Sequence, residues 1–141
     1  MKVEQSLIKI ENNSIRIIVL YIIHSSKILN PIMDTDYVKK DNTLEFNSTF
    51  NKPLSNLLDN CTNLTHIKFG YWFNQHLGNS LDKLISLTHL TFDHDFNQPL
   101  DNSLDKLISL THLTFGHKFN CPLYNALYNC TSLTHLTFDH D

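Results

Sequence analysis

Glycine and cysteine are both scarce in this sequence. Only three glycines occur among 141 residues, so most tight turns must be made by other residue types. The three cysteines, Cys61, Cys121 and Cys130, form no CxxC pair and no Cys/His group with zinc-ligand spacing. An odd number of thiols without close pairing gives no disulfide framework and is typical of a reducing compartment. These absences exclude a disulfide-stapled domain and a structural zinc site.

Excess positive charge and long apolar runs are also missing. The formal net charge is −3 with no run of Lys or Arg, which excludes a nucleic-acid partner, because phosphate binding needs a basic surface. The apolar stretch at residues 15–23 contains Arg16 and has about half of the roughly 20 residues needed to cross a bilayer. No small-residue cleavage site follows it, so we expect no signal peptide, no membrane contact and an intracellular location.

A repeat with a period of 23 residues is the main feature that the sequence does contain. A block of the type Leu-Thr-His-Leu-Thr-Phe begins at Leu64, Leu87, Leu110 and Leu133. A second block of the type Phe-Asn-x-Pro-Leu keeps the same period and begins at Phe50, Phe73, Phe96 and Phe119. We therefore divide the chain into an N-terminal capping segment, 1–40, and a repeat region, 41–141, made of units 41–63, 64–86, 87–109 and 110–132 and a partial unit 133–141.

The spacing within each unit predicts the fold. A period of 20–29 residues with Leu-x-x-Leu-x-Leu spacing is typical of leucine-rich repeats, in which stacked coils bury one another's apolar edges. Strand side chains alternate, so the fourth and sixth residues of each block should enter the core: Ile67/Phe69, Leu90/Phe92, Leu113/Phe115 and Leu136/Phe138. Leu77, Leu81 and Leu84 lie at i, i+4 and i+7, which indicates a short helical or 3₁₀ return leg, with an irregular leg as the alternative. We predict an α/β-type or mainly β solenoid of 23-residue coils with a parallel β-sheet on its concave face.

Two sets of asparagines repeat in fixed register and are expected to have structural roles. Stacked coils lie about 4.8 Å apart, so each Asn is placed to bond the backbone of its own coil and the next. Asn also tolerates the left-handed conformation, which offers a way to turn with little glycine. Cys61 and Cys130 occupy the slot of Leu84 and Leu107 and are expected in the core. The first asparagine column is Asn51, Asn74, Asn97 and Asn120, and the second is Asn56, Asn79, Asn102 and Asn125.

Both ends of the repeat array need covering, because a terminal coil would otherwise expose core. Residues 7–19 fit two strands around a turn, while a degenerate repeat or a short buried helix fits the same segment. The last strand, 133–138, has an unpaired edge that favours self-association or docking of a partner. Asp139 and Asp141 offer an alternative interpretation, in which charge discourages edge pairing.

Histidine recurs at the third position of the Leu-Thr-His block, which faces outward on the predicted sheet. Stacked imidazoles raise the question of a metal site, but these residues simply follow the repeat and no facial triad of ligands accompanies them. No Ser or Thr lies on an irregular loop beside a general base, so we expect no enzyme, no catalytic residue, no metal and no cofactor. We expect the face to bind a protein partner through His66, Lys68, Tyr71, Trp72, His89, Thr91, His94, His112, Thr114, His117 and His135.

The combined block Leu-x-x-Leu-x-Phe-x-x-x-Phe-Asn-x-Pro-Leu resembles the FNIP repeat, which is named for its Phe-Asn-Ile-Pro core. The four copies here read Phe-Asn-Lys-Pro, Phe-Asn-Gln-His, Phe-Asn-Gln-Pro and Phe-Asn-Cys-Pro, so the third residue is never Ile and His76 replaces one proline. The resemblance covers residues 44–141 and implies a leucine-rich-repeat-like fold and a source among social amoebae or their giant DNA viruses. A viral source implies a location in the host cytoplasm.

Three functions remain open from the sequence. The first is a non-enzymatic scaffold or adaptor that binds a protein partner of unknown identity. The second is an adaptor for a host ubiquitin ligase, because the resemblance implies that such arrays can follow an F-box; residues 1–40 lack the Leu-Pro-x-Glu opening of an F-box. The third is a metal-binding role for the histidines.

Overall fold

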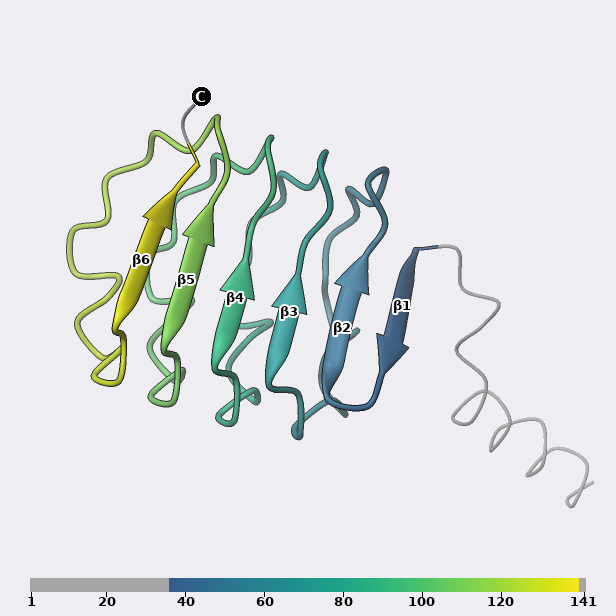
Figure 1. Ribbon diagram of the computed structural model, residues 1–141, viewed down its shortest axis with the longest axis horizontal. Helices are drawn as coiled ribbons and strands as arrows, with labels where there is room; N and C mark the ends of the chain where they lie inside the picture. The colour runs from purple at the N-terminus through teal and green to yellow at the C-terminus, as the bar shows by residue number, and fades with distance from the viewer. Residues whose placement is uncertain (1–35, 140–141) are drawn as a thin grey trace, which may run out of the picture. The chain divides into compact units, whose positions relative to one another are not determined.

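The strands of this protein form one sheet in chain order. The computed structural model describes residues 36–139, and the six strands within that range lie side by side from β1 to β6 (Figure 1). β1 is antiparallel to β2, and every later neighbour pair is parallel. The strands are β1 (Tyr37–Lys40), β2 (Thr43–Phe46), β3 (His66–Lys68), β4 (His89–Thr91), β5 (His112–Phe115) and β6 (His135–Phe138).

The register of the parallel strands matches the repeat of the sequence. Leu44 pairs with Ile67, Ile67 with Leu90, Leu90 with Leu113 and Leu113 with Leu136, so each step along the sheet advances 23 residues. A return leg without helix or strand closes each coil before the next strand begins (Figure 1). The predicted solenoid of 23-residue coils with a parallel sheet is therefore confirmed.

The apolar core follows the same period. Ile67, Leu90 and Leu113 are at most 2% exposed, as is the phenylalanine two residues after each of them. The phenylalanine of one coil stacks on that of the next, with ring centroids 5.2 Å apart for Phe69 and Phe92. Burying one such side chain stabilises the fold by about 1.5–3 kcal/mol relative to leaving it exposed. The stacked side chains therefore contribute to the cohesion between coils beside the hydrogen bonds of the strands.

The prediction that Leu136 and Phe138 would be buried is wrong for the described part of the chain. They are 40% and 39% exposed, although they occupy the register of Leu113 and Phe115. Burial in a stacked array needs a neighbouring coil on each side, and β6 has only β5 as a neighbour within residues 36–139.

The return legs are irregular, and the helical alternative is wrong for residues 36–139. Each leg is a series of turns closed by backbone bonds from residue i+3 to residue i, such as Leu84 N to Leu81 O at 3.0 Å. A residue with positive φ stands at the start of each leg, directly after a leucine that is buried in the first three legs and partly buried in the last, and such a residue cannot continue a right-handed helix. These residues are Ser55 (φ 42°), Gly78 (φ 51°), Asp101 (φ 44°) and Tyr124 (φ 34°).

Left-handed turns in this chain therefore do not use the asparagine columns, contrary to the expectation. Two of the three glycines serve a different purpose, which is close approach between coils. A Cβ on Gly70 would lie 2.1 Å from the Asn47 carbonyl oxygen, and one on Gly116 would lie 2.4 Å from that of Asp93. Of the three glycines, Gly78 is the one with a left-handed backbone conformation, and a Cβ there would have no neighbour within 4 Å. Backbone packing, more than turning, is what requires glycine here.

The first parallel strand is covered by a hairpin. β1 folds back on β2 through a turn at Asp41, whose φ is 52°, and Tyr37 packs edge-on against Phe46 with ring centroids 5.8 Å apart. The alternatives for residues 7–19 lie outside the described residues. No helix within residues 36–139 is long and apolar enough to cross a membrane.

Candidate functional site

The outward face of the sheet carries a stack of four imidazole rings, His66, His89, His112 and His135, which we call the histidine column. The rings lie parallel, with centroids 4.1, 4.2 and 4.2 Å apart and interplanar angles of 13°, 7° and 5°. The stack follows from the strand register, which aligns the first residue of β3, β4, β5 and β6. His66 and His135 are exposed, whereas His89 and His112 are half-buried by their neighbours.

A threonine precedes each histidine and ties the ring to the preceding coil. The Thr88 hydroxyl lies 2.9 Å from the Thr65 carbonyl oxygen and 2.9 Å from His89 Nδ1. Thr111 makes the equivalent contacts to Thr88 O at 3.0 Å and to His112 Nδ1 at 2.8 Å. The same arrangement recurs at Thr65 and Thr134. Each imidazole is therefore held in a fixed orientation by its own coil and the coil before it.

Protonation is disfavoured at His89, inside the column. Burial lowers the pKa of His89 below the usual histidine value, and the positive charges that His66, His112 and His135 acquire on protonation lower it further. The folded protein therefore favours the neutral form of the His89 ring.

Thr91 and Thr114 lie on the same outward face, two residues beyond His89 and His112, and both are half-buried. Lys68 occupies the equivalent position in β3, where its ammonium lies 3.3 Å from Glu45 Oε1. Trp72 is 53% exposed at the turn after β3. The structure thus brings Lys68, Thr91 and Thr114 beside the histidine column and leaves Trp72 at the following turn.

A second stack consists of Tyr71, His94 and His117, beyond the ends of the strands. Tyr71 and His94 have centroids 4.4 Å apart, and His94 and His117 have centroids 5.3 Å apart. The wider second step shows that this stack is looser than the histidine column. His140, the next residue in this register, lies outside the described residues.

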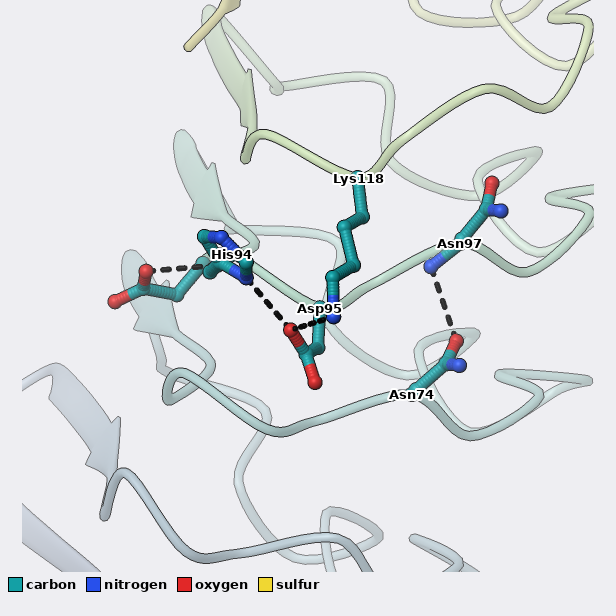
Figure 2. A network of polar contacts seen from close by, with 6 residues as sticks. Asn74, His94, Asp95, Asn97 and Lys118 are labelled. Atoms are coloured by element: carbon teal, nitrogen blue, oxygen red, sulfur yellow. Dashed lines mark hydrogen bonds and ion pairs between the residues drawn. The ribbon is translucent and has the colours of Figure 1, made fainter. Parts of the chain in front are cut away.

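A charged network anchors the second stack. Figure 2 shows the His94 imidazole and the Lys118 ammonium converging on Asp95 from successive coils. His94 Nδ1 donates to Asp95 Oδ1 at 2.6 Å, and Lys118 Nζ lies 2.9 Å from the same oxygen. The His94 bond, followed by that of Lys118, lowers the pKa of Asp95. Sequence reasoning missed this network, although Lys118 and Asp95 occupy the same repeat position in successive coils and carry opposite charges.

The two asparagine columns behave differently. Asn51, Asn74 and Asn97 each accept the backbone N–H of the asparagine in the next coil through their side-chain oxygen, at 3.0, 3.0 and 2.8 Å. The Asn74–Asn97 bond is drawn in Figure 2. The second column, represented by Asn79, makes no side-chain hydrogen bond within residues 36–139 and contributes only its backbone carbonyl to a turn. Within residues 36–139, the second column therefore lacks the cross-coil side-chain hydrogen bonds that were expected of it.

The chemistry open to these side chains is limited. Ligands of one metal ion must converge on it at about 2.0–2.1 Å, whereas parallel stacked rings direct their nitrogens in parallel. No group of three or more His, Cys, Asp or Glu residues within 36–139 is arranged to hold a metal ion. Burial raises the pKa of the Cys130 thiol, which lowers its nucleophilicity at neutral pH. Cys61, in the equivalent slot, is half-buried.

A shallow groove lies on the return legs, between the units that begin at Leu87 and Leu110. It measures about 550 Å³ and is lined by Pro99, Leu100, Pro122, Leu123 and Tyr124 among others. None of its lining residues belongs to the histidine column or to the second stack. The groove is therefore separate from the outward face of the sheet.

Comparison with known proteins identifies the fold class. No family model and no curated protein matches the sequence. Among solved structures, the chain is similar to the giant-virus protein CroV588, described as a novel circular LRR protein, with a TM-score of 0.55 and 32% identity. The match covers 67% of this chain but only 13% of that one. The chain thus has a leucine-rich-repeat-like solenoid fold and spans a small fraction of the protein that it resembles.

Proposed function

We propose that this chain is a FNIP-type repeat protein that acts as a non-enzymatic interaction scaffold, with the histidine column as its main contact surface. The observation that carries the proposal is the rigid, outward-facing stack of four rings, spaced 4.1–4.2 Å apart. Rings fixed in advance lose little conformational entropy on binding, so they favour contact with a partner. The leucine-rich-repeat-like fold supports a scaffold in general terms, and the FNIP resemblance supports a viral source and a location inside the host cell.

The test begins with capture of partners by the full chain from the native cell, followed by affinity measurement with a purified partner. The double variant His89→Ala/His112→Ala should weaken binding by at least about tenfold if these rings are at the centre of the contact. The matched control is Ile85→Ala/Ile108→Ala, which alters two side chains that are 57% and 56% exposed on the return legs leading into β4 and β5. Unchanged affinity in the histidine variant would show that the sheet face is not the contact surface.

Self-association along β6 is a second proposal. It is supported by the exposure of Leu136 and Phe138, which occupy core positions in the register of the sheet. Light scattering at high micromolar concentration should show a dimer that the variant Leu136→Glu dissociates. A monomer under those conditions would rule this contact out.

The ubiquitin-ligase adaptor is a separate proposal that is supported only by the FNIP resemblance. Recovery of ligase subunits by the full chain, and their loss on deletion of residues 1–35, would favour it. Recovery of other partners without ligase subunits would count against it.

A further inference from the structure

The position of one proton on each ring of the histidine column follows from the threonine contacts. A hydroxyl has a single proton, and a backbone carbonyl has none to give. The Thr88 hydroxyl donates to the Thr65 carbonyl oxygen at 2.9 Å, an oxygen that also accepts the backbone N–H groups of Thr88 and His89. His89 Nδ1, 2.9 Å from the same hydroxyl oxygen, must then carry a proton and donate it to Thr88.

The same argument applies to all four rings. Thr65, Thr111 and Thr134 donate to a carbonyl of the preceding coil at 3.3, 3.0 and 3.2 Å, and each accepts from the next residue's Nδ1 at 2.8–2.9 Å. A neutral imidazole carries only one N–H, so Nε2 of every ring in the column is left as a bare acceptor. Because the rings are parallel, the four Nε2 lone pairs leave the stack side by side.

Charges on the outward face are confined to one end of the sheet. The side chains of Lys40, Glu45 and Lys68 lie over β1, β2 and β3, where Lys68 is paired with Glu45. On β4, β5 and β6 this face carries only histidine and threonine. Asp93 lies two residues beyond β4, and Asp139 directly follows β6. The histidines begin these strands and the two carboxylates lie beyond their opposite ends, so the acceptors over β4–β6 have no charged group of either sign on their own strands' face.

We propose that the histidine column over β4–β6 is an acceptor array that binds a basic protein segment, whose ammonium and guanidinium groups donate to the Nε2 atoms. This inference rests on the proposed function and specifies the chemistry of the partner. Lys and Arg side chains are donors without acceptor capacity, so they complement bare lone pairs. A carboxylate or phosphate would instead face those lone pairs with its own. The net charge of −3 adds a general attraction for a basic partner.

The test uses the full chain and two probes, hexalysine and hexaglutamate peptides, titrated calorimetrically at about pH 7.5, which is above the usual histidine pKa of about 6.5. Hexalysine should bind and hexaglutamate should not. The variant His89→Phe/His112→Phe keeps stacked rings but removes two acceptors, and should weaken hexalysine binding about tenfold. The variant His89→Gln/His112→Gln keeps a side-chain acceptor and should retain most of the affinity. Circular dichroism of both variants confirms that they fold.

Three results would overturn the acceptor array: no binding of hexalysine, equal binding by the phenylalanine and wild-type chains, or binding of hexaglutamate at neutral pH. Failure of this inference remains distinguishable from failure of the proposed function. If a captured partner is lost by the alanine double variant but retained by the phenylalanine one, the face binds partners through ring contact and the acceptor array is wrong. If both variants keep that partner, the face itself is wrongly assigned.

Discussion

Thr88 Oγ1 and His89 Nδ1 lie 2.9 Å apart, and the same hydroxyl reaches the Thr65 carbonyl of the preceding coil. One side chain thus couples an outward ring to the backbone of a neighbouring repeat. The contact recurs at each coil from Thr65 to Thr134. The geometry of the histidine column is therefore a consequence of the stacking of the coils. A substitution that disturbs the contact between two coils should also change the orientation of the imidazole rings.

Replacing Thr88 by valine should destabilise the protein by about 1 kcal/mol, because it removes the cross-coil hydrogen bond and leaves His89 Nδ1 without its partner. The measurement is urea unfolding followed by circular dichroism. Thr91→Val is the matched control, since Thr91 ends β4, the strand that directly follows Thr88, and its side chain makes no hydrogen bond within residues 36–139. Equal losses in the two variants would contradict a structural role for the Thr88 hydroxyl.

The two asparagine columns should respond differently to alanine. Asn74→Ala removes the acceptor for the Asn97 backbone N–H and for Gln98 Nε2, and should cost about 1 kcal/mol of unfolding free energy. Asn79→Ala removes an exposed side chain without hydrogen bonds within residues 36–139 and should change stability by less than about 0.5 kcal/mol. The same urea experiment measures both. A larger loss for Asn79 would mean that the second column has contacts outside the described residues.

Much of the fold could be predicted from the sequence, because a fixed period determines both register and alternation. Ile67, Leu90 and Leu113 had to align once the 23-residue spacing was recognised, and their burial followed. Periodicity alone does not predict the burial of Leu136. It has the register of Leu113, but it is exposed because no described coil covers it on its far side.

Tyr124→Gly should stabilise the protein by up to about 1 kcal/mol. Tyr124 has φ 34°, a conformation that costs an L-residue energy, and its side chain is 89% exposed, so little burial is lost. Gly78 occupies the same repeat position with φ 51°. Thermal unfolding should therefore show a higher midpoint for Tyr124→Gly and a lower one for Gly78→Ala. A lower midpoint for Tyr124→Gly would indicate that the tyrosine ring makes a stabilising contact in the groove beside it.

Acid should lower the free energy of unfolding of the protein through His89. The pKa of His89 is lowered in the folded protein, so between that value and the usual 6.5 the unfolded chain binds more protons. The contribution is fully present above about pH 6.5 and is lost as the pH falls through the folded-state pKa. The charged or titratable groups on the same face are His66, His112, His135, Lys68, Glu45 and Lys40.

Urea midpoints at about pH 7.5 and pH 5 measure this effect on either side of the histidine titration. His89→Gln should reduce the pH dependence, whereas His76→Gln, at an exposed histidine outside the column, should leave it unchanged. If stability increased on acidification, the column would not be held neutral in the folded state.

The His94–Asp95 bond and the difference between the asparagine columns could not be predicted from the repeat. Periodicity places equivalent residues together, as it does Asp95 and Lys118, but it does not show which side chains form hydrogen bonds. His94 and Asp95 are neighbours in sequence, and nothing in the repeat indicates that His94 Nδ1 turns to Asp95 Oδ1. Asn74 and Asn79 are equally regular, and only the first is placed where the next coil presents a backbone N–H.

The protonation state of the histidine column is the most direct test of the account. A long-range ¹H–¹⁵N correlation spectrum of the full chain at about pH 7.5 distinguishes the two neutral tautomers of each ring. The threonine contacts predict the Nδ1–H tautomer for His66, His89, His112 and His135. Nε2–H tautomers at these four residues would contradict it, because the bare acceptors and the binding of a basic segment through them would then be lost.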